Sequence, residues 1–168
     1  MLNEVEAFAV EARRFRAWAD NPPDGVAGAR AALLRVSALY NAALHLPDPW
    51  HPDLEKEEEP PELTHEEWRL VYDRVARALP LGYYGVVSDP IVVPPEEPVI
   101  GDIGDDIADI YRDVVPGLAA FDAGARLQAR YEWAFGFQNH WGAHAADATK
   151  ALHAYLSQES PESLLGGV

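Results

Sequence analysis

Residues 102–122 read DIGDDIADIYRDVVPGLAAFD, and this stretch decides the fold. Its apolar residues recur every three or four positions, which is the period of an α-helix with one buried face. These positions are Ile103, Ile107, Ile110, Tyr111, Val114, Leu118 and Phe121. The same period occurs in four other stretches, so the sequence predicts an all-α fold.

The four other helices are expected over residues 2–20, 24–46, 64–79 and 125–157. The first two should form an antiparallel hairpin because only a short turn connects them. Thr64 and Glu67 have the spacing of a capping box and predict the start of the third helix. Pro116 lies inside the fourth helix and predicts a kink or a split there. Together these stretches predict an up-and-down bundle of about five helices.

Two segments lack helical periodicity. Residues 47–63 contain five prolines and a run of glutamates, which is typical of a solvated loop. Residues 80–101, between the third and fourth helices, are extended and proline-rich but also apolar. We expect them to pack over the bundle as an ordered strap, with a small hairpin or an extension onto a second copy of the chain as alternatives.

Length and composition limit the class of protein. The 168 residues predict a single domain over residues 1–168, with a flexible tail from about residue 158. The absence of cysteine excludes disulfides, iron–sulfur clusters and thiolate zinc sites. Neither a signal peptide nor a membrane span is recognisable, so a cytoplasmic location is expected. The net charge of −15 opposes binding to nucleic acid.

Aspartates are concentrated on the fourth helix. A helical projection places all of them opposite the apolar face, so we expect them to be exposed to solvent. The usual interpretation is a solvated face, and the alternative is a site for a divalent cation or a cationic ligand. The residues are Asp102, Asp105, Asp106, Asp109 and Asp113, with Arg112 at their margin.

Two histidines on the fifth helix are the other candidate site. His140 and His144 are four residues apart, so both rings can reach one metal ion, and Asp147 follows one turn later as a third ligand or an orienting partner. The same projection places both histidines in the middle of the buried aromatic face. The favoured interpretation is therefore a pair of hydrogen-bonded core residues. A third possibility is that they are the polar contacts of a small-ligand pocket lined by Trp133, Phe137, Trp141 and Tyr155.

Two motifs resemble a bacterial family known as domain of unknown function 5063. Residues 105–113, DDIADIYRD, are similar to its Asp-Asp-Leu-Ala-Asp-Ile-Tyr-Arg-Asp motif, and residues 140–144, HWGAH, to its His-Trp-Gly-x-His element. The resemblance implies a small helical protein without an assigned activity. It also implies that residues of the two motifs meet in one place, as a polar network or as a shared site. These residues are Asp105, Asp106, Asp109, Tyr111, Arg112, His140, Trp141 and His144.

The sequence thus favours a helical-bundle protein without catalysis that binds a protein partner, a small ligand or a second copy of itself. Its candidate binding residues are Asp105, Asp106, Asp109, Tyr111, Arg112 and Trp141. The alternative is a metal-dependent, hydrolase-like enzyme that uses His140, His144 and Asp147 with carboxylates of the fourth helix. No cofactor is required by the sequence, but a divalent metal is compatible with it. Neither nucleic acid nor a membrane is expected as a partner.

Overall fold

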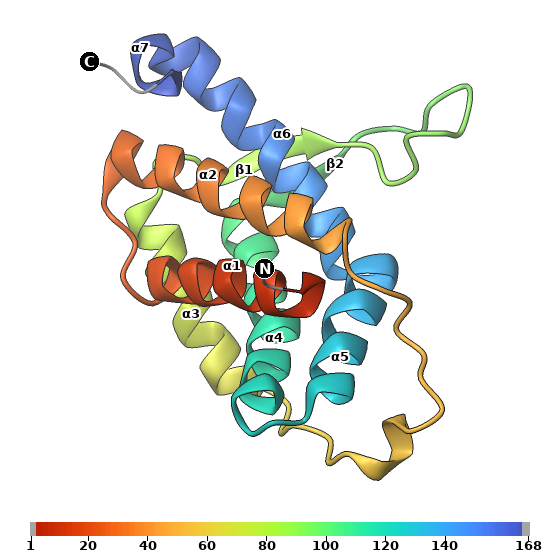
Figure 1. Cartoon of the computed structure of the whole chain (residues 1–168). Helices are drawn as coiled ribbons and strands as arrows, with labels where there is room; N and C mark the ends of the chain where they lie inside the picture. Colours follow the sequence, from red (N-terminus) through yellow and green to blue (C-terminus); the bar gives the residue numbers. More distant parts are fainter. Residues whose placement is uncertain (1–2, 166–168) are drawn as a thin grey trace.

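The computed structural model describes residues 3–165, and helices dominate it (Figure 1). This confirms the all-α bundle. The helices are α1 (Glu4–Asp20), α2 (Gly25–Ala43), α3 (His65–Ala78), α4 (Ile103–Asp122), α5 (Arg126–Asn139), α6 (Trp141–Glu159) and α7 (Pro161–Leu164), with one 3-10 turn, η1 (Leu54–Lys56). Two strands, β1 (Tyr83–Val86) and β2 (Val99–Asp102), pair antiparallel. Leu2, where the first helix was expected to start, lies outside the described residues.

Capping boxes fix the starts of two helices. The Thr64 side chain accepts a hydrogen bond from the backbone N–H of Glu67, whose carboxylate accepts one from the backbone N–H of Thr64, as the sequence predicted. Asn3 and Glu6 form the same reciprocal pair at the start of α1. The α2 helix ends at Ala43, three residues earlier than expected, and Leu44 beyond it is exposed.

The central element of the fold is α4. It packs against α1, α3, α5 and α6, and 15 of its 20 residues are buried. Pro116 does not split it: the helix continues through Asp122, and the indole Nε1 of Trp133 donates to the carbonyl of Val114 at 2.9 Å. Gly117 makes this approach possible, since a Cβ there would lie 2.4 Å from Trp133 Nε1. Because helices surround α4, the side opposite its apolar stripe is largely covered as well.

The expected fifth helix is two helices. The backbone leaves helical geometry at His140 (φ −149°, ψ −82°), which ends α5 and precedes α6. Gly142 allows the junction to be tight, because a Cβ at that position would lie 2.2 Å from the carbonyl oxygen of Phe137. The break lets Trp133 and Trp141 both enter the core, where the indole of Trp141 donates to the Trp133 carbonyl at 3.1 Å.

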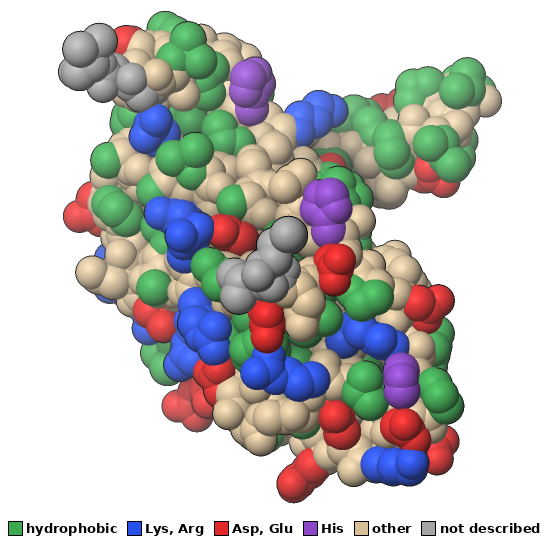
Figure 2. All heavy atoms as spheres, viewed as in Figure 1, with side chains coloured by type: hydrophobic (Ala, Val, Ile, Leu, Met, Phe, Trp, Pro, Cys, Tyr) green, Lys and Arg blue, Asp and Glu red, His purple; other side chains and the backbone are tan. Residues whose placement is uncertain are grey.

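The proline-rich segment forms a hairpin and not the preferred strap. Pairing of β1 with β2 holds its base, while residues 87–98 project away from the helices (Figure 1). Apolar side chains cover much of this tip (Figure 2), and Ile91 and Val93 are almost fully exposed. Backbone hydrogen bonding explains why a hairpin forms instead of a strap. The two strands satisfy each other's N–H and C=O groups, whereas a strap across the helices would leave these groups without partners.

The segment expected as a flexible tail from about residue 158 is helical through Leu164. The α6 helix extends to Glu159, and α7 packs against α6 and α2. Residues 166–168 of that tail lie outside the described residues. Within residues 3–165, no helix is both long and apolar enough to cross a lipid bilayer.

Substitution of Gly117 by alanine should destabilise the protein by about 1–3 kcal/mol, because the added methyl group collides with the fully buried Trp133. Urea unfolding followed by tryptophan fluorescence measures this. Gly85→Ala is the control, since a Cβ there meets no atom within 4 Å. Equal unfolding free energies for the two variants would contradict the packing role of Gly117.

Candidate metal centre

The aspartates of α4 are not on a solvated face. Asp106 is 5% exposed and Asp109 is 8% exposed, and the expectation that they face open water is wrong for both. The reason is the central position of α4: its contacts with α3, α5 and α6 cover the side that a projection of one helix assigns to solvent. Buried carboxylates require hydrogen-bond donors, and the surrounding helices supply them.

The two histidines are the main donors. His140 Nδ1 lies 2.7 Å from Asp113 Oδ2, and His144 Nδ1 lies 2.8 Å from Asp106 Oδ1. Because a carboxylate can only accept, each Nδ1 carries the proton. The side chains of His140 and His144 are 40% and 26% exposed, so they lie at the edge of the core and not in the middle of a buried aromatic face. Both rings are therefore oriented by carboxylates, with their Nε2 atoms free to point elsewhere.

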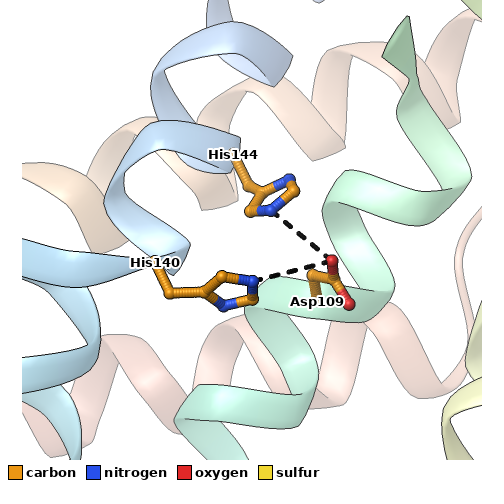
Figure 3. A group of neighbouring side chains, drawn as sticks. All are labelled: Asp109, His140 and His144. Atoms are coloured by element: carbon orange, nitrogen blue, oxygen red, sulfur yellow. Dashed lines mark ion pairs between the residues drawn. The ribbon is translucent and has the colours of Figure 1, made fainter.

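Asp109 lies where the two Nε2 atoms point. Its Oδ1 accepts from Trp68 Nε1 at 2.8 Å and from Arg112 at 3.0 Å. Its Oδ2 faces His144 Nε2 at 3.5 Å and His140 Nε2 at 4.0 Å (Figure 3). One ligand atom from each of these three residues lies within 4.8 Å of the other two. We call Asp109, His140 and His144 the triad.

Three ligand atoms with lone pairs converge in the triad. A neutral imidazole that donates through Nδ1 has a lone pair on Nε2, and the carboxylate oxygen opposite also presents lone pairs. A positive charge between these atoms would lower their mutual repulsion. The hydrogen bond to Asp106 raises the pKa of His144 despite partial burial, and the nearby carboxylates Asp109 and Asp105 also raise it.

Four other candidate residues do not belong to the triad. Asp105 is half-buried without a hydrogen bond or ion pair to another described residue, and desolvation and then Asp109 raise its pKa. Asp147 is not in the triad; it lines a separate pocket beside Tyr84, and its pKa is raised by desolvation and then by Asp106. Tyr111 donates to Asp20 at 2.9 Å, and Trp141 is fully buried in the core.

Two of the three side chains that complete the cluster, Trp68 and Tyr84, were not among the candidates chosen from sequence. Asp113 belonged to the aspartate run, and its four-residue step from Asp109 was the available signal. Trp68 and Tyr84 reach the cluster from α3 and β1, and no spacing within α4 or α6 indicates them. They are found only once the tertiary packing is known.

A pocket of about 660 Å³ adjoins the triad. Trp68, Arg112, Asp113 and His140 contribute to its wall from α3, α4 and the α5–α6 junction. Most of the remaining wall comes from the loop before α3 and from α5, including Glu132, whose pKa is raised by desolvation despite a hydrogen bond from Gln128. His140 is thus the member of the triad that a small molecule in this pocket would contact.

Fold and site define an all-α protein with a His/Asp cluster between its central helix and the α5–α6 junction. A family model described as a domain of unknown function, DUF5063, matches residues 2–158, so the chain belongs to that family, as its motifs suggested.

Among solved structures, the chain is similar to the crystal structure of protein BF1032 from Bacteroides fragilis, a structural-genomics target. The TM-score is 0.68 at 19% sequence identity, over 88% of this chain and 91% of that one. At this identity the similarity supports the fold alone. A search of curated proteins finds no match.

The stability of metal-free protein should fall as the pH rises above about 6.5. The pKa of His144 is raised above its usual value of 6.5, so the folded state holds this proton more tightly than the unfolded chain. The stabilisation is then complete below the unfolded pKa and is lost as the pH rises through the folded pKa. Urea midpoints from about pH 5.5 to about pH 8.5, with a chelator present, measure this. His144→Gln should flatten the profile, and identical profiles would contradict the assignment.

Proposed function

We propose that the protein binds a divalent transition-metal ion through His140 Nε2, His144 Nε2 and Asp109 Oδ2. The observation that carries this proposal is the spacing of these atoms. At 3.5 and 4.0 Å, the Nε2–Oδ2 separations exceed those of ordinary N–H···O hydrogen bonds, which are about 2.7–3.2 Å. Two ligands that share a tetrahedral ion at about 2.0–2.1 Å lie about 3.4 Å apart. Both Nε2–Oδ2 separations are therefore closer to the ligand–ligand spacing around a shared ion than to hydrogen-bond distances.

The partners of the triad support the same proposal. A metal-binding histidine usually donates its other ring N–H to a carboxylate or carbonyl, which fixes the tautomer and the ring orientation. Asp113 does this for His140 and Asp106 does it for His144. Two imidazoles and one carboxylate suit zinc, iron(II) or manganese, whereas the softer ions that prefer thiolates have no ligand in this chain.

Three protein ligands leave at least one coordination position for water or an exogenous group. His140 belongs both to the triad and to the wall of the 660 Å³ pocket, which supports a small ligand that reaches the metal from that side. Our first proposal is thus that this site binds a metal ion together with a small molecule from the pocket. A protein partner or a homodimer stays a prediction, favoured by the exposed apolar tip of the β1–β2 hairpin.

The metal proposal predicts one equivalent of zinc, iron or manganese in protein purified without an affinity tag. Asp109→Asn or His144→Ala should weaken binding by about 100-fold or more, since even partners outside the ligand set are worth about 10–100-fold. Asp147→Asn is the matched control and should change the affinity by less than about 3-fold, because Asp147 is not in the triad. Calorimetric titration of chelator-treated protein measures these values. Absence of binding by the parent, or equal losses in D109N and D147N, would refute the site.

A metal-dependent hydrolase is the second candidate, and Asp105 is the observation that favours it. It lies one helical turn before Asp109, so the two side chains share a face of α4. Its carboxyl group makes no hydrogen bond or ion pair to the described residues, and its raised pKa suits a general base. A metal ion lowers the pKa of bound water, and Asp105 would accept the proton that this water releases.

Metal-loaded protein should then hydrolyse at least one of p-nitrophenyl phosphate, p-nitrophenyl acetate or leucine p-nitroanilide. Asp105→Asn should lower kcat by about 100-fold or more while the bound metal is retained. Asp147→Asn again serves as the control, since its carboxyl group lies beside the hairpin. An Asp105→Asn variant with full turnover would exclude the general base, and a metal-loaded parent that cleaves none of the three would count against the hydrolase.

A further inference from the structure

The β1–β2 hairpin contacts the cluster through one side chain. Tyr84, on β1, donates its phenol O–H to Asp106 Oδ2 at 2.6 Å. The other oxygen of Asp106 is the partner of His144 Nδ1 at 2.8 Å. Asp106 is therefore a bridge with one oxygen for the hairpin and one for the histidine. Because this carboxylate is 5% exposed, water cannot readily replace either donor.

The hairpin is built so that the phenol can reach this position. Tyr84 is paired with Gly101 on β2, and its ring lies across that glycine, where a Cβ would be 2.5 Å from Tyr84 Cζ. The N–H of Ile103, the first residue of α4, donates to the carbonyl of Gly82 at 2.9 Å. The base of the hairpin is thus fixed to the start of the helix that carries Asp106.

We propose that Tyr84 is a positioning residue of the metal centre, so that metal binding and docking of the hairpin onto α4 stabilise each other. This inference rests on the proposed metal site. The phenol holds the Asp106 carboxylate in one orientation, and that carboxylate holds the His144 ring with Nε2 directed at Asp109 Oδ2. Coupling between two such sites is reciprocal. If docking of the hairpin increases the affinity for the metal, metal binding stabilises the docked hairpin by the same free energy.

The neighbouring tyrosine provides a matched control. Tyr83 lies on the same strand but is 70% exposed and makes no side-chain hydrogen bond to the described residues. Tyr84→Phe removes only the oxygen that binds Asp106, whereas Tyr83→Phe removes an oxygen with no partner there. The two variants have the same composition, so a difference between them reports on the bond to Asp106.

Zinc titration of chelator-treated full-length protein is the test. We expect Tyr84→Phe to weaken zinc binding about 3- to 10-fold, less than a partner bonded directly to a ligand, and Tyr83→Phe to leave it unchanged. Zinc should slow amide hydrogen exchange in β1 and β2 of the parent and of Y83F, but less in Y84F. The visible spectrum of the cobalt(II) form should also change in Y84F alone, since that spectrum follows ligand geometry.

Gly101→Ala gives a second variant that keeps the phenol but displaces its ring, and it should reproduce the loss seen in Y84F, with Gly85→Ala as its control. Equal zinc affinities and exchange rates in Y84F and Y83F would overturn the role of Tyr84 and leave the metal site standing. Failure of the parent to bind zinc, iron(II) or manganese would overturn the metal site itself, and the inference with it.

Discussion

The burial of carboxylates along one side of α4 is the constraint on which the rest of the site depends. Helices cover that side, so the oxygens of Asp106 and Asp109 need hydrogen-bond donors from neighbouring elements. The donors come from α3, β1, α4 itself and α6. Segments far apart in the sequence thus converge on a few oxygen atoms, and this convergence fixes how they pack.

The break at His140 lies beside these carboxylates. Trp133 and Trp141, on either side of it, are fully buried in one core, while the imidazoles of His140 and His144 face carboxylates of α4. Gly142 lowers the cost of the tight junction, because no Cβ opposes the Phe137 carbonyl.

Periodicity and capping predicted most of the helices, because those signals lie within each segment: the Thr64–Glu67 box and the stripe of α4 needed no knowledge of the fold. The exposure of the aspartates could not be predicted in this way. A projection shows which residues oppose the apolar stripe of a helix, but not which other helices pack there. The pairs that form the site, such as His140 with Asp113 and Tyr84 with Asp106, are separated by 27 and 22 residues, and only tertiary packing brings them together.

Charge balance favours added positive charge at the triad. Asp105, Asp106, Asp109 and Asp113 together present four carboxylates against the single cation of Arg112, and two of the four, Asp106 and Asp109, are buried, which is costly without compensation. Two protons on the histidines or one divalent ion would each supply the same two positive charges, so charge alone does not separate them. The distances favour the proposed ion. A proton stabilises the pair when Nε2 and Oδ2 are within hydrogen-bond distance, whereas a shared ion would hold them apart, at a spacing close to the separations between Asp109 and the two rings.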